Sequence, residues 1–281
     1  MAIVNSRAAI EPKTGKAAIF VNEIIHSLIR KLFANNEQGF FYDPNDLTTM
    51  WQDQAKLLPV TGAGQPVWHI LDKSGNNNHA FATSSATRPI LRQNATTGAY
   101  YLEFDGSDDF FVTNSINFTS TDKISLFAGV RKLADSAQII AELSASVSAN
   151  IGAFALVAGS DLGGIGYTSG ARGTNSSSSP QVARSFTYPA PDTAVLSAKH
   201  DISGNLSSMR RNGVVGIDGT GAKGTGNFGN YPIYIGRRGG ITLPFNGHIY
   251  GLIGVGRLTT DAETTALEKF IAKNVGVTLS V

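Results

Sequence analysis

The segment YYLEFDGSDDFF, residues 100–111, constrains the fold of this chain more than any other. An aromatic, alternating run meets an acidic turn at Gly106, and a second apolar run follows at once. Such a pattern is typical of two β-strands joined by a tight bend. The polar segment LDKSGNNNHA, residues 71–80, has the same turn character. We expect Asp72–Ala80 and Glu103–Phe111 to be bends between the layers of a body built from two sheets.

Composition supports many short strands. The 281 residues include 31 glycines, and Ser, Thr and Asn fill the gaps between apolar runs, as turns require. Asn212-Gly213 predicts a type I′ hairpin, since both positions accept a positive φ. We expect residues 170–180 to be an exposed loop. The predicted strands are Val67–Leu71, Tyr100–Phe104, Phe110–Val112, Ile124–Arg131, Gln138–Leu143, Ala153–Val157, Val182–Phe186, Ala194–Lys199, Ser207–Arg211, Val214–Ile217, Ile233–Gly236 and His248–Val255.

Residues 1–38 differ from the rest and predict an arm followed by a helix over Ala17–Ala34. The apolar residues of this helix cover most of its circumference, whereas a surface helix normally buries a single stripe. The pattern favours docking onto another protein or an oligomer interface; packing against the chain's own sandwich is equally well supported. The candidate docking residues are Phe20, Val21, Ile24, Ile25, Leu28, Ile29, Leu32 and Phe33.

A second helix is predicted near the C-terminus. Thr260 and Glu263 form a capping box, and Gly276 ends the helix. Its apolar face is expected to pack on the sandwich, with Glu268 and Lys269 in solvent. That face comprises Ala262, Ala266, Leu267, Phe270 and Ile271.

Charge and cysteine content exclude several classes of protein. Lys and Arg number 23 against 21 Asp and Glu, with no basic stripe that would favour nucleic acid. Cysteine is absent, which removes disulfides and thiolate sites and fits folding in a reducing cytosol. The N-terminal residues do not resemble a secretory signal, and no apolar run approaches the ~20 residues of a membrane span.

Several motifs, in order, resemble the laminin-G-like domains of the concanavalin A-like lectin and glucanase superfamily. They are the two turns above, ISLFAGVR (124–131), RRNGVVG (210–216), IYIGR (233–237), FNGHIYGL (245–252) and LTTDAE (258–263). The resemblance implies an all-β, antiparallel jelly-roll β-sandwich over residues 39–281, with an N-terminal helical arm and one C-terminal helix.

A narrower resemblance concerns residues 41–53, FYDPNDLTTMWQD, together with GQPV (64–67) and LDKSG (71–75). These segments are similar to structural proteins of tailed bacteriophages, where they precede a laminin-G-like domain. The resemblance implies a virion component on a tail fibre, baseplate or capsid. Its partners would be other virion proteins, bound through residues 1–38, and further copies of the chain.

Catalytic and cofactor sites find little support. Glu103 and Asp105 invite comparison with glucanases, but Gly106 interrupts the strand, so we expect turn hydrogen bonds from the Asp side chains. Calcium at this turn stays open, and no metal site or other cofactor is predicted. Gly219–Gly224 matches G-x-G-x-x-G but precedes no helix, so we predict no dinucleotide site.

Three functions therefore remain, in decreasing order of support. The first is a non-enzymatic virion protein whose lectin-like domain contacts host glycan. The second is an adhesin whose main role is carbohydrate binding, and the third is a depolymerase. The candidate carbohydrate-binding residues are Trp68, His79, Asp105 and Asp108. For Trp51 and Trp68, packing in the core is preferred to stacking on sugar.

Overall fold

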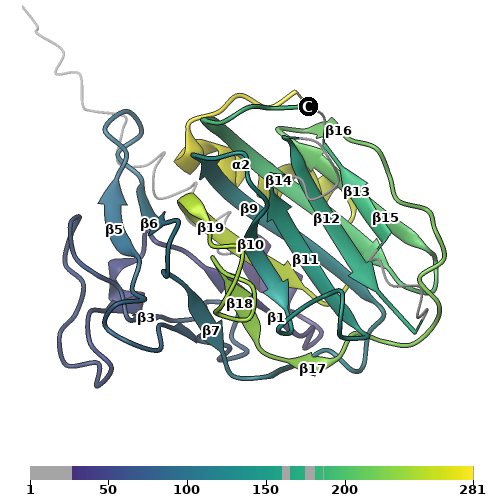
Figure 1. The fold of residues 1–281 in the computed structure, drawn as a ribbon, viewed down its shortest axis with the longest axis horizontal. Helices are drawn as coiled ribbons and strands as arrows, with labels where there is room; N and C mark the ends of the chain where they lie inside the picture. The colour runs from purple at the N-terminus through teal and green to yellow at the C-terminus, as the bar shows by residue number, and fades with distance from the viewer. Residues whose placement is uncertain (1–26, 160–164, 175–180, 186, 281) are drawn as a thin grey trace, which may run out of the picture.

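The computed structural model describes residues 27–159, 165–174, 181–185 and 187–280. They form two stacked antiparallel sheets with α2 (Asp261–Val275) behind β9 and β14 in the view of Figure 1. Sheet A runs β16 (Val214–Val215), β15 (Leu206–Arg211), β14 (Asp192–Asp201), β9 (Lys123–Lys132), β19 (Asn246–Val255), β6 (Tyr100–Asp105) and β5 (Ile90–Gln93), and β1 (Gly39–Tyr42) also pairs with β19. No helix among the described residues is long and apolar enough to span a membrane.

Sheet B contributes the second layer. Its order is β13 (Gln181–Arg184), β12 (Tyr167–Arg172), β11 (Ala153–Ala158), β10 (Gln138–Leu143), β18 (Ile233–Ile235), β7 (Phe111–Thr113), β4 (Ala80–Phe81), β3 (His69–Ile70) and β2 (Met50–Trp51). Two short strands, β8 (Ile116–Asn117) and β17 (Asn230–Tyr231), pair separately, and a 3₁₀ turn spans Leu47–Thr49.

Strand alternation builds the core between the sheets. In β9, alternate residues Ile124, Leu126 and Ala128 are fully buried in the main apolar cluster. β9 pairs with β14 along the full length of both strands, from Lys123–Asp201 to Lys132–Asp192. A shift of one residue would turn these side chains to the opposite face, so the buried alternation fixes the register.

The acidic turn carries the chain from one sheet to the other, as predicted, since β6 lies in sheet A and β7 in sheet B. Gly106 has φ +78°, and a Cβ there would lie 2.7 Å from Cβ of Asn246. The prediction for Asp72–Ala80 was wrong in this respect, because the segment joins β3 and β4, which are neighbours within sheet B. Its Asp72 carboxylate accepts backbone N–H groups of Phe41, Ser74 and Asn78 and so fixes the loop to β1.

The outer face of sheet A is covered by two helical segments. Residues 27–32 are helical, and Ile29 and Leu32 pack in one apolar cluster with Leu267 and Ile271 of α2. The predicted capping box is present, with Thr260 Oγ1 accepting from Glu263 N.

Two predictions for α2 were wrong. Glu268 is fully buried rather than solvated, and its carboxylate accepts a hydrogen bond from Ser197 Oγ at 2.6 Å. Ala262, expected on the apolar face, is exposed, whereas Lys269 is exposed as predicted. Glu268 lies between two apolar positions of the helix, so a simple apolar stripe does not reveal that it faces the sheet.

Most long strands match the predicted ranges, and the Asn212-Gly213 hairpin has positive φ at both residues. Residues 167–172 form the buried strand β12, so the exposed loop predicted from Gly170 onward is wrong for Gly170–Arg172. The predicted loop residues 175–180 lie outside the described residues.

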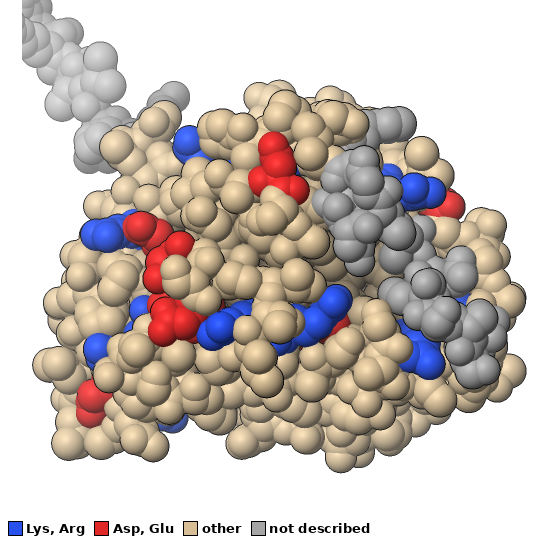
Figure 2. Space-filling model, viewed as in Figure 1, with Lys and Arg blue, Asp and Glu red and all other residues tan. Residues whose placement is uncertain are grey.

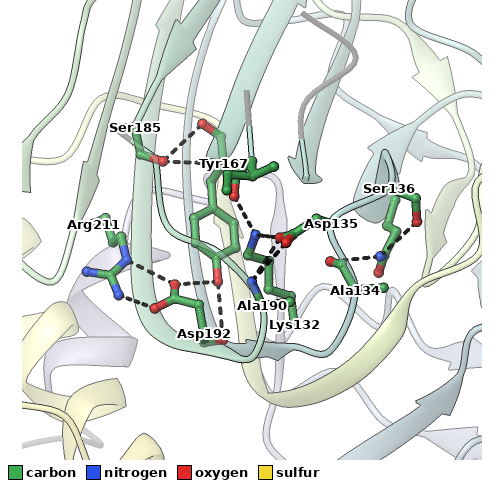
Figure 3. A network of polar contacts seen from close by, with 11 residues as sticks. Lys132, Ala134, Asp135, Ser136, Tyr167, Ser185, Ala190, Asp192 and Arg211 are labelled. Atoms are coloured by element: carbon green, nitrogen blue, oxygen red, sulfur yellow. Dashed lines mark hydrogen bonds and ion pairs between the residues drawn. The ribbon is translucent and has the colours of Figure 1, made fainter. Parts of the chain in front are cut away.

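A buried polar network closes one end of the sandwich (Figure 3). Lys132, fully buried at the end of β9, places Nζ 2.6 Å from an Asp135 carboxylate oxygen. Nearby, Asp192 accepts from the Tyr167 hydroxyl and pairs with Arg211. These contacts join β9, β12, β14 and β15, so charged groups here are compensated inside the protein.

Candidate functional site

A row of half-buried side chains crosses the outer face of sheet B. In the strand register, Trp51 lies opposite His69, His69 opposite Phe81, Phe81 opposite Val112, and Val112 opposite Tyr234. Directly paired residues point to the same face of a sheet, so these five, which we call the outer row, lie side by side. With strands about 4.8 Å apart, the outer row extends over roughly 19 Å.

The residues flanking the outer row on each strand are the apolar side chains of the core. Met50, Ile70 and Ala80 are fully buried, and so are Phe111 and Ile235. Since successive residues of a strand alternate between faces, this burial turns the outer row toward solvent. The row is therefore held by the packing of the sandwich behind it.

Aromatic and imidazole rings supply four of the five positions. The His69 and Phe81 rings are 6.2 Å apart between centroids, and Lys56 Nζ lies 5.8 Å from the centre of the Trp51 ring. Nε2 of His69 lies 3.0 Å from the carbonyl oxygen of Gln54, which orients the ring. Burial lowers the pKa of His69, so its imidazole is neutral at pH 7.

The outer row ends against an ion pair. Tyr234 lies opposite Glu142, which is fully buried and accepts from Arg238 Nε at 2.9 Å and from Val147 N at 2.6 Å. Figure 2, drawn from the same side as Figure 1, shows a largely uncharged face with basic and acidic groups gathered in a band across its middle. The row thus combines flat apolar surfaces with polar groups at one end.

The structure places the predicted binding residues in three separate segments. His79 lies in the loop between β3 and β4, where its Nδ1 accepts from Asp72 N at 3.1 Å; burial, followed by the charge of Lys56, lowers its pKa. Trp68 directly precedes β3, and the Arg88 guanidinium lies 5.9 Å from the centre of its ring. Both tryptophans, Trp51 and Trp68, are half-buried, so they pack only partly in the core, and one part of each side chain is open to solvent.

Asp105 and Asp108 lie together in the turn after β6. Asp105 Oδ1 accepts from the backbone N–H groups of Ser107 and Asp108, and Asp109 Oδ2 accepts from Asp105 N. These bonds confirm the expected turn role of Asp105 and Asp109. Burial, followed by the neighbouring Asp105 carboxylate, raises the pKa of Asp109 to about 7.

The same turn fits the calcium alternative by ligand type. Asp105, Asp108 and Asp109 each bring one carboxylate oxygen within 4.8 Å of the others, and calcium takes such oxygens as ligands. Those three residues would hold the ion, which would stiffen the link between the two sheets.

The residues considered for catalysis are engaged elsewhere. Glu103 lies on β6 opposite His248 and receives a hydrogen bond from Arg92 Nε at 2.5 Å. Asp105, two residues further along β6, accepts the backbone N–H groups of Ser107 and Asp108. Residues 219–229, which contain the G-x-G-x-x-G match at Gly219–Gly224, form no helix, as predicted.

The candidate docking residues divide into two groups. Leu28, Ile29, Leu32 and Phe33 pack against the outer face of sheet A and α2, which is the intramolecular alternative left open by the sequence. Phe20, Val21, Ile24 and Ile25 lie outside the described residues. For those four, docking onto a partner stays a prediction.

Sequence reasoning missed most of the outer row. Only Trp51 had been considered for sugar contact; His69, Phe81, Val112 and Tyr234 had not. Their strands contribute two or three residues each and come from distant parts of the chain. Only the strand order shows that they line up.

Comparisons with known proteins support the fold. No protein-family model matches the sequence, and no curated protein does. Among solved structures, the chain is similar to the binding domain of botulinum neurotoxin serotype D, with TM-score 0.52, 9% identity, and coverage of 82% of this chain and 51% of that one. A second similar structure is that of botulinum neurotoxin type C, whose description states that cell entry depends on interaction with two ganglioside molecules. It has a TM-score of 0.53 and 11% identity, and the match covers 84% of this chain and 52% of that one.

An arabinofuranosidase complexed with arabinofuranosyl-alpha-1,2-xylobiose gives a TM-score of 0.51 at 12% identity, covering 76% of this chain and 52% of that one. The chain therefore spans about half the length of these structures. The likenesses confirm the predicted fold, a β-sandwich of two antiparallel sheets.

Proposed function

We propose that this protein is a lectin-like, carbohydrate-binding β-sandwich that acts as a receptor-binding module and has no catalytic activity. The observation that carries the proposal is the outer row, in which four rings stand in register across sheet B. Aromatic faces are apolar and flat, so they complement the C–H faces of sugar rings. The structural neighbours support it, because the descriptions of two of them name gangliosides or a bound oligosaccharide.

The ligand class follows from the charge around the row. His69 is neutral at pH 7, Glu142 is paired with Arg238, and the Lys56 ammonium lies over the Trp51 ring, 5.8 Å from its centre. A length of roughly 19 Å suits an extended chain of several sugars better than a single ring. We therefore infer an uncharged oligosaccharide lying across the strands.

A glycan array with the whole chain, followed by titration calorimetry on the best binder, tests this proposal. Trp51→Ala and Tyr234→Ala should each raise Kd at least about tenfold, the loss of ~1.4 kcal/mol expected for an aromatic contact at a binding site. Tyr188→Ala is the matched control, since this half-buried aromatic packs on Arg211, away from the row. Equal affinities for all three variants would contradict the proposed site.

The phage setting is a proposal of its own and rests on the resemblance of residues 41–53 and 64–75 to virion proteins. In that setting the module would sit on the virion and touch host glycan, with residues 1–38 joining it to other virion proteins. Mass spectrometry of purified virions from a host producing this chain would test it, and absence of the chain from virions would refute it.

A further inference from the structure

A groove lies on the other side of the sandwich, between the start of α2 and the outer face of strands β14 to β16. Its volume is about 310 Å³, at the lower end of the range for small-ligand sites. The polar residues that line it are Ser197, Lys199, Ser208, Arg210, Asp218 and Asp261. It faces away from the outer row, because that row belongs to sheet B.

Strand register arranges the floor of the groove. Ser197 lies opposite Arg210, and Lys199 opposite Ser208, so four polar side chains form a square on the outer face of sheet A. The Arg210 guanidinium donates from Nε to the Gly213 carbonyl at 3.2 Å, which fixes the side chain. The floor is therefore preorganised by the sheet.

Glu268 stands behind this floor. Its Oε1 accepts from the Ser197 hydroxyl, and its Oε2 forms an ion pair with Arg210 Nη2 at 3.1 Å. Glu268 is fully buried, so it does not line the groove but holds Ser197 and Arg210 in place beneath it.

The groove balances charge and mixes donors with acceptors. Lys199 and Arg210 supply cations, and Asp218 and Asp261 supply carboxylates. The serine hydroxyls can both donate and accept hydrogen bonds. The Lys199–Asp261 ion pair is long at 3.4 Å, and the Asp261 side chain is 98% exposed, so a ligand hydroxyl can replace it. Val215, 60% exposed, adds an apolar wall.

A neutral polyol is the ligand class that uses all of these features. Its hydroxyls donate to carboxylates and accept from cations, and its C–H face can lie on Val215. A phosphate or carboxylate ligand would be repelled by the carboxylates of Asp218 and Asp261. An amine would be repelled by the cations of Lys199 and Arg210. The volume suits one or two sugar rings.

We propose that the groove between α2 and β14–β16 is a second saccharide site that holds one or two neutral sugar units. This inference rests on the proposed carbohydrate-binding function and extends it. With sites on opposite faces, one chain can bridge two glycans, and linked sites raise overall avidity when both are engaged.

Amide chemical shifts of the ¹⁵N-labelled full chain test the inference during titration with glucose, galactose, N-acetylglucosamine, arabinose and their β-linked disaccharides. Inorganic phosphate and acetate serve as anionic controls. At least one sugar should shift the amides of residues 197–199 and 208–210 saturably, and the anions should not. Lys199→Met should raise Kd for that sugar about tenfold, the loss of one charged hydrogen bond. Lys269→Met is the control, because this lysine is exposed on α2 and does not line the groove, and it should leave Kd unchanged.

The outcomes separate the two sites. Sugar shifts confined to the outer row would overturn the second site and leave the proposed function intact. Shifts confined to the groove would support the second site and remove the outer row from the function. Silence in both regions would refute both, and a saturable response to phosphate or acetate alone would make the groove an anion site and overturn the proposal.

Discussion

The hydroxyl oxygen of Ser169 lies 2.8 Å from Nε2 of His200, and this contact crosses the interior of the sandwich from β12 in sheet B to β14 in sheet A. Nδ1 of His200 meets Ser207 Oγ at the same distance. All three residues are fully buried, so the serine–histidine pair has no access to substrate. It is a cross-sheet hydrogen bond that holds a neutral imidazole in the core.

Lowering the pH should reduce the free energy of unfolding, because His200 is buried in its neutral form. Burial lowers the pKa of His200 to about 3, against 6.5 for an unperturbed histidine. The unfolded state therefore binds more protons between these values, so the stabilisation is complete above pH 6.5 and is lost as pH falls toward 3. From pH 7 to pH 4 the loss is on the order of 3 kcal/mol in the free energy of unfolding. Urea unfolding at several pH values measures it.

His200→Gln removes this titration. The variant should be less stable at pH 7 and should lose less stability between pH 7 and pH 4 than the original chain. Lys269→Gln is the control, because that side chain is exposed and lies outside the core. Equal pH slopes for His200→Gln and the original chain would contradict the assignment.

The two partners of the Lys132–Asp135 ion pair should respond unequally to substitution. Figure 3 shows the contact between the two side chains. Lys132 is fully buried, whereas the Asp135 side chain is 35% exposed. Asp135→Ala leaves an ammonium buried without its partner, for which we expect a loss of about 3 kcal/mol in the free energy of unfolding. Lys132→Met keeps the aliphatic stem and leaves Asp135 near water, so its loss should be smaller. Chemical denaturation of both variants measures the difference; a larger loss for Lys132→Met would contradict this account.

The long strands and the C-terminal helix could be predicted from sequence, because their signals are local. β9 and β10 are runs of ten and six mostly apolar residues, long enough to be recognised, and Thr260 with Glu263 marks the start of α2. β12 was missed because its run YTSGAR lacks large apolar residues. Its burial comes from β11 and β13 on either side, which a local pattern does not contain.

The candidate site was predicted less well for the same reason. Trp51 and Tyr234 are separated by most of the chain, and each belongs to a strand of two or three residues. Their alignment depends on four strand pairings between segments that are distant in the sequence. Turn chemistry around Asp105 was local and therefore predictable.

Two glycines that face each other across β9 and β19 should differ sharply in their tolerance of a methyl group. A Cβ on Gly129 would lie 2.6 Å from both Ile271 Cγ2 and Val275 Cγ2 of α2. Its partner Gly251 would meet only the Tyr42 carbonyl oxygen, at 3.6 Å. Gly129→Ala should therefore lower the free energy of unfolding by about 1–3 kcal/mol, because the added methyl group forces α2 outward. Gly251→Ala should lower it by less. Thermal unfolding followed by circular dichroism compares them; equal melting temperatures would show that α2 adapts freely.

Affinity should depend on ligand length in a way that reports the extent of the outer row. An oligosaccharide that reaches from Tyr234 to Trp51 contacts rings over roughly 19 Å, whereas a disaccharide covers only part of that distance. For a ligand series of increasing length, affinity should rise until both ends of the row are covered and then level off.

Two variants locate the short ligand on the row. Trp51→Ala should weaken binding of the longest ligands about tenfold. If the disaccharide binds near Tyr234, the same variant should change the affinity for the disaccharide little. Tyr234→Ala should give the opposite pattern if it sits at the Trp51 end, so the two variants together locate the short ligand. Titration calorimetry on the series measures these differences, and a length dependence unaffected by either variant would mean that oligosaccharides do not lie along this row.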